Sequence, residues 1–169
     1  MLIPYQGILP KVHPTAWLAE TAVLIGDVEV GEESSVWYGC VLRGDVMHVR
    51  VGKHTNIQDG SILHVEGGKY PCIVGDNVSV GHMAIVHGCE VGDGALIAMG
   101  AIVLNNVKVG EGAVVGAGAV VPEGKVIPPG TLWVGTPAKY VRDLRPDERE
   151  RFRMTAVHYS ELKGRYRRG

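Results

Sequence analysis

Aliphatic residues recur every six positions along most of this 169-residue chain, and glycine often follows them. The pattern falls into four runs, which are Val12, Leu18, Leu24, Val30, Val36 and Leu42; Val51, Ile57 and Leu63; Val74, Val80 and Val86; and Val91, Ile97, Val103, Val109, Val115 and Val121. An amphipathic helix repeats every 3.6 residues and a half-buried strand every two, so a period of six fits neither. Hexad repeats are typical of a parallel β-helix, in which each hexad forms a short strand and a turn. Three hexads, about eighteen residues, would close one triangular coil.

The composition suits the narrow interior of such a coil. Glycine supplies 24 of the 169 residues, about twice its ordinary share, while Phe occurs once. Val and Ile side chains are thin enough to fill a triangular prism, and glycine relieves corners where the backbone needs a positive φ. We therefore expect an all-β fold, a hexapeptide-repeat parallel β-helix over residues 1–125. Spacing alone does not give the hand of the coil.

The remainder of the chain is predicted to cover this β-helix within the same single domain. Proline and glycine are frequent in residues 126–145, which are expected to form an exit strap. Residues 146–164 are expected to form a helix packed along the β-helix. Pro146 suits the first helical turn, and Asp147 and Glu148 would lie at the positive end of the helix dipole.

Charge and composition exclude several classes of partner. The formal net charge is −1 with histidine neutral, which argues against nucleic acid and anionic membranes. The N-terminal MLIPYQGILPKVHP lacks a basic region followed by an apolar run, so we expect neither a signal peptide nor a membrane span. The three cysteines are odd in number and lack CxxC spacing, which favours a reducing, cytoplasmic setting.

The six-residue step slips at three points, and such loops are where functional residues tend to lie. The step is nine residues at RGDVMH (43–48), eleven at HVEGGKYPC (64–72) and five around HGC (87–89). When the extra residues are set aside, Arg43, His64 and His87 are each one coil apart. They should therefore form a column on one edge of the prism, with about 4.8 Å between coils.

A third histidine, His82, lies one hexad before His87 and shares its edge with Gln58 of the coil below. A single chain would hold His64 and His87 together and point His82 elsewhere. A closed homotrimer that joins the two edges would bring the third histidine from a neighbour. Three imidazoles with an open fourth position are the ligand set of a catalytic zinc site.

Three motifs in this order resemble those of the gamma-class carbonic anhydrases: LRGD (42–45), NIQDGSILH (56–64) and VGHMAIVHGC (80–89). The repeats and the exit WVGTPAKYVR (133–142) are less specific, because hexapeptide acyltransferases share them. The resemblance implies a left-handed β-helix and a homotrimer whose metal sites lie between subunits. It also implies that His64, His82 and His87 bind zinc, with Fe²⁺ as an alternative metal.

The resemblance implies roles for further residues. Metal lowers the pKa of a bound water to about 7, and the resulting hydroxide would hydrate CO2 to bicarbonate. Gln58 would orient that hydroxide and Asn56 would place the substrate. Arg43 and Asp45 would pair across the interface near bicarbonate, with a purely structural salt bridge as the alternative. Tyr159 would reach toward the site from the helix, with core packing as the alternative.

The sequence departs from the family pattern in its acidic residues. The family's archetype has a glutamate directly after the Arg-x-Asp motif and a longer acidic loop after the first histidine. Here Val46 follows that motif, and Glu66 is the only acid of the short loop VEGGKYPC (65–72). Fast CO2 hydration needs proton export, so we expect weak activity unless Glu66 takes this role. Otherwise Glu66 is a solvated loop acid.

Two other functions stay open at this point. One is a non-catalytic trimeric metal-binding or scaffold protein. The other is an acyltransferase or thioesterase-like enzyme built on hexapeptide repeats. Such an enzyme needs a general-base histidine and an acyl-carrier groove, but not three histidines at metal-ligand spacing.

Overall fold

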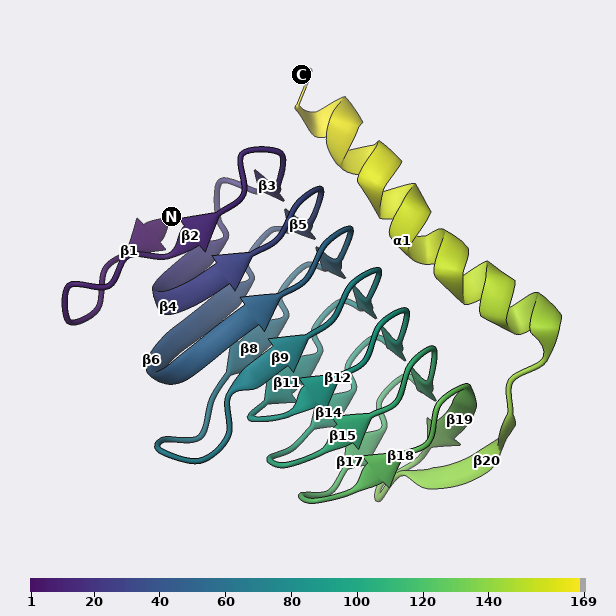
Figure 1. Ribbon diagram of the computed structural model, residues 1–169. Helices are drawn as coiled ribbons and strands as arrows, with labels where there is room; N and C mark the ends of the chain where they lie inside the picture. The colour runs from purple at the N-terminus through teal and green to yellow at the C-terminus, as the bar shows by residue number, and fades with distance from the viewer. Residues whose placement is uncertain (168–169) are drawn as a thin grey trace.

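Short parallel strands wind into a solenoid in the computed structural model (Figure 1), which describes residues 1–167. The strands stack from coil to coil into three sides. The first side contains β1 (Leu2–Ile3), the first halves of β4 (Val23–Val30) and β6 (Val41–Val51), β8 (Ile62–His64), β11 (Ile85–His87), β14 (Ile102–Val103) and β17 (Val120–Val121).

The other two sides are built in the same way. The second side contains β2 (Lys11–Val12), the second halves of β4 and β6, β9 (Cys72–Val74), β12 (Glu90–Val91), β15 (Lys108–Val109) and β18 (Val126–Ile127). The third side contains β3 (Trp17–Leu18), β5 (Ser35–Val36), β7 (Asn56–Ile57), β10 (Ser79–Val80), β13 (Leu96–Ile97), β16 (Val114–Val115), β19 (Thr131–Val134) and the antiparallel β20 (Lys139–Asp143). The predicted parallel β-helix with a C-terminal helix is confirmed.

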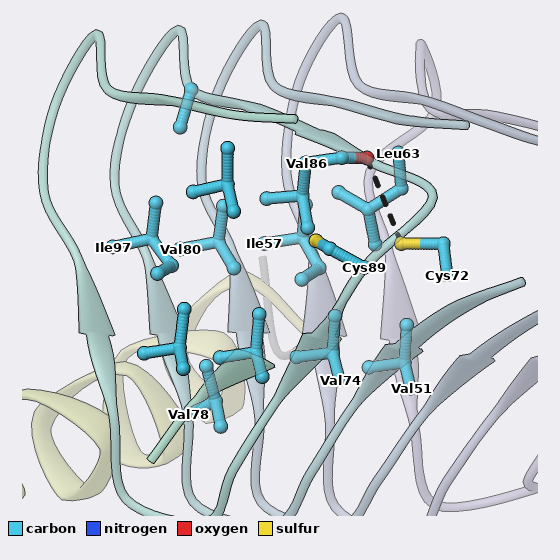
Figure 2. Packing of buried hydrophobic residues seen from close by; sticks show 14 of the residues in the cluster. Val51, Ile57, Leu63, Cys72, Val74, Val78, Val80, Val86, Cys89 and Ile97 are labelled. Atoms are coloured by element: carbon cyan, nitrogen blue, oxygen red, sulfur yellow. Dashed lines mark hydrogen bonds between the residues drawn. The ribbon is translucent and has the colours of Figure 1, made fainter. Parts of the chain in front are cut away.

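The predicted six-residue positions form the core. Apart from Val12 and Leu18, which are partly buried, every aliphatic position of the four runs is buried. Counterparts in successive coils pair in register, as Leu63 does with Val86. Figure 2 shows these side chains stacked in rows inside the solenoid. The period of six is therefore the spacing of inward-facing side chains.

The cysteines belong to this core. Cys40, Cys72 and Cys89 are buried and free, and the Cys72 thiol donates to the carbonyl oxygen of Val86 at 3.6 Å (Figure 2). Burial raises the pKa of Cys40 to about 11 and that of Cys89 to about 12. Such thiols stay protonated near neutral pH, so they are packing groups rather than nucleophiles.

The solenoid continues beyond the boundary predicted at residue 125. β18 stacks on β15 and β19 stacks on β16, so the first part of the predicted strap completes a further coil. Ile127 and Trp133 keep the six-residue step after Val121, which is why they join the stack. Only β20 leaves the pattern, because it turns back and pairs antiparallel with β19.

The helix α1 (Pro146–Tyr166) runs back along the solenoid and ends near the first coils (Figure 1). It covers the third side through aromatic contacts, with Trp37 meeting Tyr159 and Tyr166 at ring-centroid distances of 5.2 Å each. Glu148 caps the first turn by accepting the backbone N–H of Arg145 at 3.0 Å. Among the described residues, no helix combines the length and apolar character needed to cross a membrane.

Lys163 fastens the far end of the helix to the first coils. Its side chain is only 3% exposed, and its ammonium donates to the Glu33 carboxylate at 2.6 Å and the Glu33 carbonyl at 2.5 Å. This hydrogen bond is the main reason that the pKa of Glu33 lies below its ordinary value of 4.5. The contact joins residues far apart in sequence and holds α1 against the third side.

We predict that Lys163→Met lowers the free energy of unfolding by roughly 2 kcal/mol, because it removes a buried charged donor. The melting temperature should fall by about 4–8 °C at neutral pH. Lys53→Met is the matched control, since the Lys53 side chain is 59% exposed.

Lowering the pH should reduce the difference in melting temperature between Lys163→Met and the wild type. Because the folded-state pKa of Glu33 is lowered, its ion pair stabilises the fold above about pH 4.5 and this stability is lost as pH falls through the folded pKa. Melting curves from pH 7 to pH 3 test this. A melting-temperature difference that stays constant over that range would contradict a stabilising Lys163–Glu33 ion pair.

Candidate metal centre

His64 and His87 lie side by side in successive coils at the end of the first side. β8 and β11 pair them directly, at the register that the coil count predicts. Their ring centroids are 5.0 Å apart, and His64 Nδ1 lies 3.0 Å from His87 Nε2. Arg43 follows the Leu42–Leu63 pair and so continues the column one coil earlier.

The other ring nitrogens of both histidines contact oxygen acceptors. Asp45 Oδ1 lies 3.1 Å from His64 Nε2, and Asn105 Oδ1 lies 2.7 Å from His87 Nδ1. Asn105 Nδ2 donates to Glu66 Oε2 at 3.3 Å. An ionised carboxylate only accepts hydrogen bonds, so Glu66 fixes which end of the Asn105 amide faces His87.

These contacts leave two lone pairs facing each other. Burial raises the pKa of Asp45, but hydrogen bonds from His64 and Arg43 outweigh it and keep this carboxyl ionised. Asp45 therefore requires the proton of neutral His64 on Nε2, which leaves Nδ1 bare. Asn105 likewise requires a proton on His87 Nδ1, which leaves Nε2 bare. Two bare nitrogens 3.0 Å apart repel each other unless a cation lies between them.

A metal ion suits this gap better than a proton. Burial is the main cause that lowers the pKa of His64, so this ring resists protonation at neutral pH. Neutral imidazole is the form that binds zinc, with Zn–N distances of about 2.0–2.1 Å. Tetrahedral geometry then separates two ligand nitrogens by about 3.3 Å. The 3.0 Å gap would need to open by only a few tenths of an ångström.

His82 stands apart from this pair, just after β10 on the third side. Asp59 Oδ2 lies 2.8 Å from His82 Nδ1, and both side chains are 41% exposed. The Tyr159 hydroxyl lies 3.3 Å from His82 Nε2. Tyr159 also packs edge-on against Trp37, so both of the roles proposed for it, reaching toward a site histidine and packing, have a contact in the structure.

Asn56 and Gln58 lie on the same edge as His82. Gln58 Nε2 donates to Asn56 Oδ1 at 2.9 Å, and Asn56 Nδ2 donates to Ser79 Oγ at 2.9 Å. Gln58 lines a cavity of about 380 Å³ together with His82 and Tyr159. Asn56 is only 1% exposed and its amide oxygen accepts from Gln58, while its role in placing the substrate stays a prediction.

The predicted site residues thus fall into two groups on different edges of one chain. The first group contains Arg43, Asp45, His64, Glu66 and His87, and the second contains Asn56, Gln58, His82 and Tyr159. Within residues 1–167, no three His, Cys, Asp or Glu side chains are gathered so that they could hold a metal ion. The three predicted metal ligands are thus divided between the groups, with His64 and His87 in the first and His82 in the second.

Two contacts of these groups were not predicted from the sequence. Asn105 is one coil of eighteen residues after His87, and Asp59 stands one coil before His82 once the loop insertion is set aside. The same coil count that aligned the histidines would have found both. Asn and Asp are common at turns, however, so their types alone carry no signal.

The Arg43–Asp45 pair forms within one chain, where Arg43 Nη1 donates to Asp45 Oδ2. This contact agrees with the salt-bridge alternative, and a pair across a subunit interface stays a prediction. The Arg43 side chain is 43% exposed, and that of Asp45 only 14%. Asp45 therefore links Arg43 to His64, and the guanidinium keeps a solvent-facing portion.

Known proteins with similar sequences and structures agree with this fold. The family model described as "Bacterial transferase hexapeptide (six repeats)" matches residues 88–123. Gamma carbonic anhydrase 3, mitochondrial, of Arabidopsis thaliana is 56% identical over 90% of this chain and 61% of its own length. A carbonic anhydrase of Geobacillus kaustophilus is 45% identical over 98% of this chain and 90% of its own length.

The chain belongs to the gamma carbonic anhydrase family. It spans about three fifths of the length of the mitochondrial members that it matches. A hexapeptide transferase family protein from Anaplasma phagocytophilum has a similar structure, with a TM-score of 0.93 and 40% identity over 98% of this chain and 97% of that one. Gamma carbonic anhydrases and hexapeptide transferases therefore share this solenoid. The fold does not distinguish the two functions, so the residues of the site have to.

We predict that His64 is the Nε2–H tautomer and His87 the Nδ1–H tautomer in the metal-free protein, since Asp45 and Asn105 only accept from them. Long-range ¹H–¹⁵N correlation spectra of the imidazole rings measure this directly. Asp45→Ala should return His64 to a mixture of tautomers while leaving the exposed His13 unchanged. Two rings of the same tautomer in the wild type would contradict the facing lone pairs.

Proposed function

We propose that this protein is a metal-dependent carbonic anhydrase that hydrates CO2 reversibly to bicarbonate and works as a homotrimer. The observation that carries the proposal is the pair of unprotonated nitrogens on His64 and His87, which lie 3.0 Å apart. Asp45 and Asn105 hold the proton of each ring on its other nitrogen. A cation between the two nitrogens would relieve their repulsion, and two imidazoles alone do not complete a zinc site. His82 of a neighbouring copy is the third ligand that we propose.

The character of the three sides supports assembly through the first one. Apart from the column of Arg43, His64 and His87, its outward residues are aliphatic, with Ile62 40% exposed and Leu104 37% exposed in the chain. The outward residues of the second side are largely charged: Lys11, Glu29, Arg50, Glu90 and Lys108. The third side is covered by α1. The aliphatic face beside His64 and His87 is thus the one suited to contact another copy.

The donor set fits zinc, with Fe²⁺ as an alternative, since neutral imidazoles bind both. When bound there, the metal would acidify a coordinated water to a pKa of about 7 and so supply the nucleophile for CO2. The protein's own residues then have to orient this nucleophile, hold the anionic product and remove a proton.

Gln58 is the residue that we propose orients the nucleophile. Ser79 and Asn56 form a chain of hydrogen bonds that uses the Nε2 group of Gln58 as a donor. The carbonyl Oε1 is then the end left to accept a hydrogen bond in the cavity that Gln58 lines beside His82. A fixed acceptor of this kind selects one orientation of an attacking O–H group.

In this proposal Arg43 binds the bicarbonate product and Glu66 accepts the proton. The Arg43 guanidinium is half-exposed beside His64, where it can donate charge-assisted hydrogen bonds to bicarbonate. Glu66 is held near His87 through Asn105 and is the acid placed to accept a proton. It replaces the archetype's larger acidic set, so we expect proton transfer to limit turnover.

Two alternatives make different predictions from the same fold. A non-catalytic trimeric scaffold would bind metal without hydrating CO2. An acyltransferase, which the transferase family match and the Anaplasma phagocytophilum structure favour, would bind acetyl coenzyme A and would not need His64, His82 and His87 together.

Metal analysis and a CO2 hydration assay on mixed variants test the shared site. His64→Ala and His82→Ala chains should each assemble without metal. When the two are unfolded, mixed in equal amounts and refolded, about a quarter of the sites should regain metal and activity, because each mixed trimer pairs one intact half-site with the other. A His64→Ala and His87→Ala mixture is the control, since both changes damage the same half-site.

Recovery in the first mixture alone would support the proposal. Equal failure of both mixtures would overturn the interfacial site. Metal recovery without CO2 hydration would favour the scaffold, and acetyl coenzyme A binding by metal-free protein would favour the acyltransferase.

Small buffers should accelerate turnover strongly, because imidazole with a pKa near 7 can accept the proton that no large acidic set receives. Glu66→Gln keeps a hydrogen-bond acceptor for Asn105 but removes the titratable carboxyl. It should lower kcat at low buffer, leave kcat/KM nearly unchanged and be rescued by imidazole. Stopped-flow hydration measures all three. If kcat of this variant equals that of the wild type at every buffer concentration, Glu66 has no part in proton transfer.

A further inference from the structure

All three histidines of the proposed centre contact a fixed oxygen acceptor through one ring nitrogen. The acceptors are Asp45 for His64 at 3.1 Å, Asn105 for His87 at 2.7 Å and Asp59 for His82 at 2.8 Å. The repetition of this arrangement on two separate edges of the chain indicates a common purpose.

We propose that Asn105 and Asp59 are positioning residues that make His87 and His82 offer Nε2, and not Nδ1, to the metal. This inference rests on the proposed function. An acceptor at Nδ1 holds the proton there, orients the ring and makes the opposite nitrogen a better ligand. Without it, each neutral ring would divide its population between two tautomers, and only one of these would present the correct lone pair.

The backbone at Gly88 leaves room for the Asn105 side chain. A Cβ atom on Gly88 would lie 2.5 Å from Asn105 Oδ1, so the residue after His87 has to be glycine for the amide to approach. Gly88 also has a φ of +54°, which other residues rarely adopt. It lies where the repeat is one residue short, between Val86 and Val91. The shortened step therefore coincides with the room that Asn105 occupies.

Glu66 completes the arrangement by holding the amide of Asn105 in one orientation. Its Oε2 accepts from Asn105 Nδ2 at 3.3 Å, so the Oδ1 end must face His87. A rotated amide would present N–H to His87 and would favour the other tautomer. Glu66 thus acts on His87 through Asn105, in addition to its proposed part in proton transfer.

His82 is held from both sides in the single chain. Asp59 accepts from Nδ1, so the Tyr159 hydroxyl is the donor in its 3.3 Å contact with Nε2. Tyr159 therefore occupies the same lone pair that the metal would take. The two partners of His82 have opposite effects, because Asp59 prepares the ligand nitrogen and Tyr159 has to release it.

Cobalt titration of the metal-free trimer against a chromophoric chelator tests the inference. Asn105→Leu and Asp59→Ala remove the acceptors and should weaken Co²⁺ binding about 10–100-fold. Asn105→Asp and Asp59→Asn keep an acceptor and should stay within about threefold of the wild type. Tyr159→Phe should bind Co²⁺ at least as tightly as the wild type. Asp147→Asn, on the first turn of α1, controls for a general loss of carboxylate.

A second measurement separates positioning from misfolding. Imidazole ¹H–¹⁵N spectra of the metal-free trimers should show the Nδ1–H form of His82 in Asp59→Asn but a mixture in Asp59→Ala. Folded Asn105→Leu and Asp59→Ala trimers that bind Co²⁺ like the wild type would overturn this inference and leave the proposed function standing. A wild-type trimer that binds no Co²⁺ would overturn the proposed function itself.

Discussion

The in-register stacking of parallel coils is the constraint on which the candidate site depends. Each strand pairs with its counterpart one coil away, so side chains at one hexad position repeat at the strand spacing of about 4.8 Å. His64 and His87 occupy such counterparts, directly after the fully buried Leu63 and Val86. The core therefore fixes the backbone beneath both rings, and no loop has to close to bring them together. Preorganisation of this kind is what a metal site on a rigid element requires.

The interruptions of the repeat surround this pair with its partners. The longer step at residues 43–48 belongs to β6, which carries Asp45 to His64. The loop over residues 64–72 carries Glu66 to Asn105, and the shortened step at Gly88 admits Asn105 to His87. A perfect repeat would give stacked histidines with unsatisfied outer nitrogens. The proposed function thus depends on departures from the repeat that forms the solenoid.

The column of histidines was predictable from the sequence because period and insertions convert directly into coil register. The contacts that Asp59 and Asn105 make with the histidines could not be predicted, because they depend on which side-chain atom faces which ring nitrogen. Asp59 and Asn105 align with His82 and His87 by the same count, yet a turn residue gains meaning only when its partner atom is known. The boundary at residue 125 was wrong for a simpler reason. Proline and glycine suggested a strap, although Ile127 and Trp133 keep the six-residue step.

Division of the ligand set between two edges links metal binding to assembly in the proposed trimer. Two facing lone pairs on His64 and His87 are unfavourable in an isolated chain, and His82 there is bound to Tyr159 instead of a metal. When two copies join, a cation is needed both to separate the lone pairs of His64 and His87 and to replace Tyr159 as the partner of His82. Since anything that binds the assembled state alone stabilises it by mass action, metal should stabilise the trimer and the trimer should stabilise metal binding. The aliphatic first side then provides affinity between copies, while the histidines make that affinity depend on the metal.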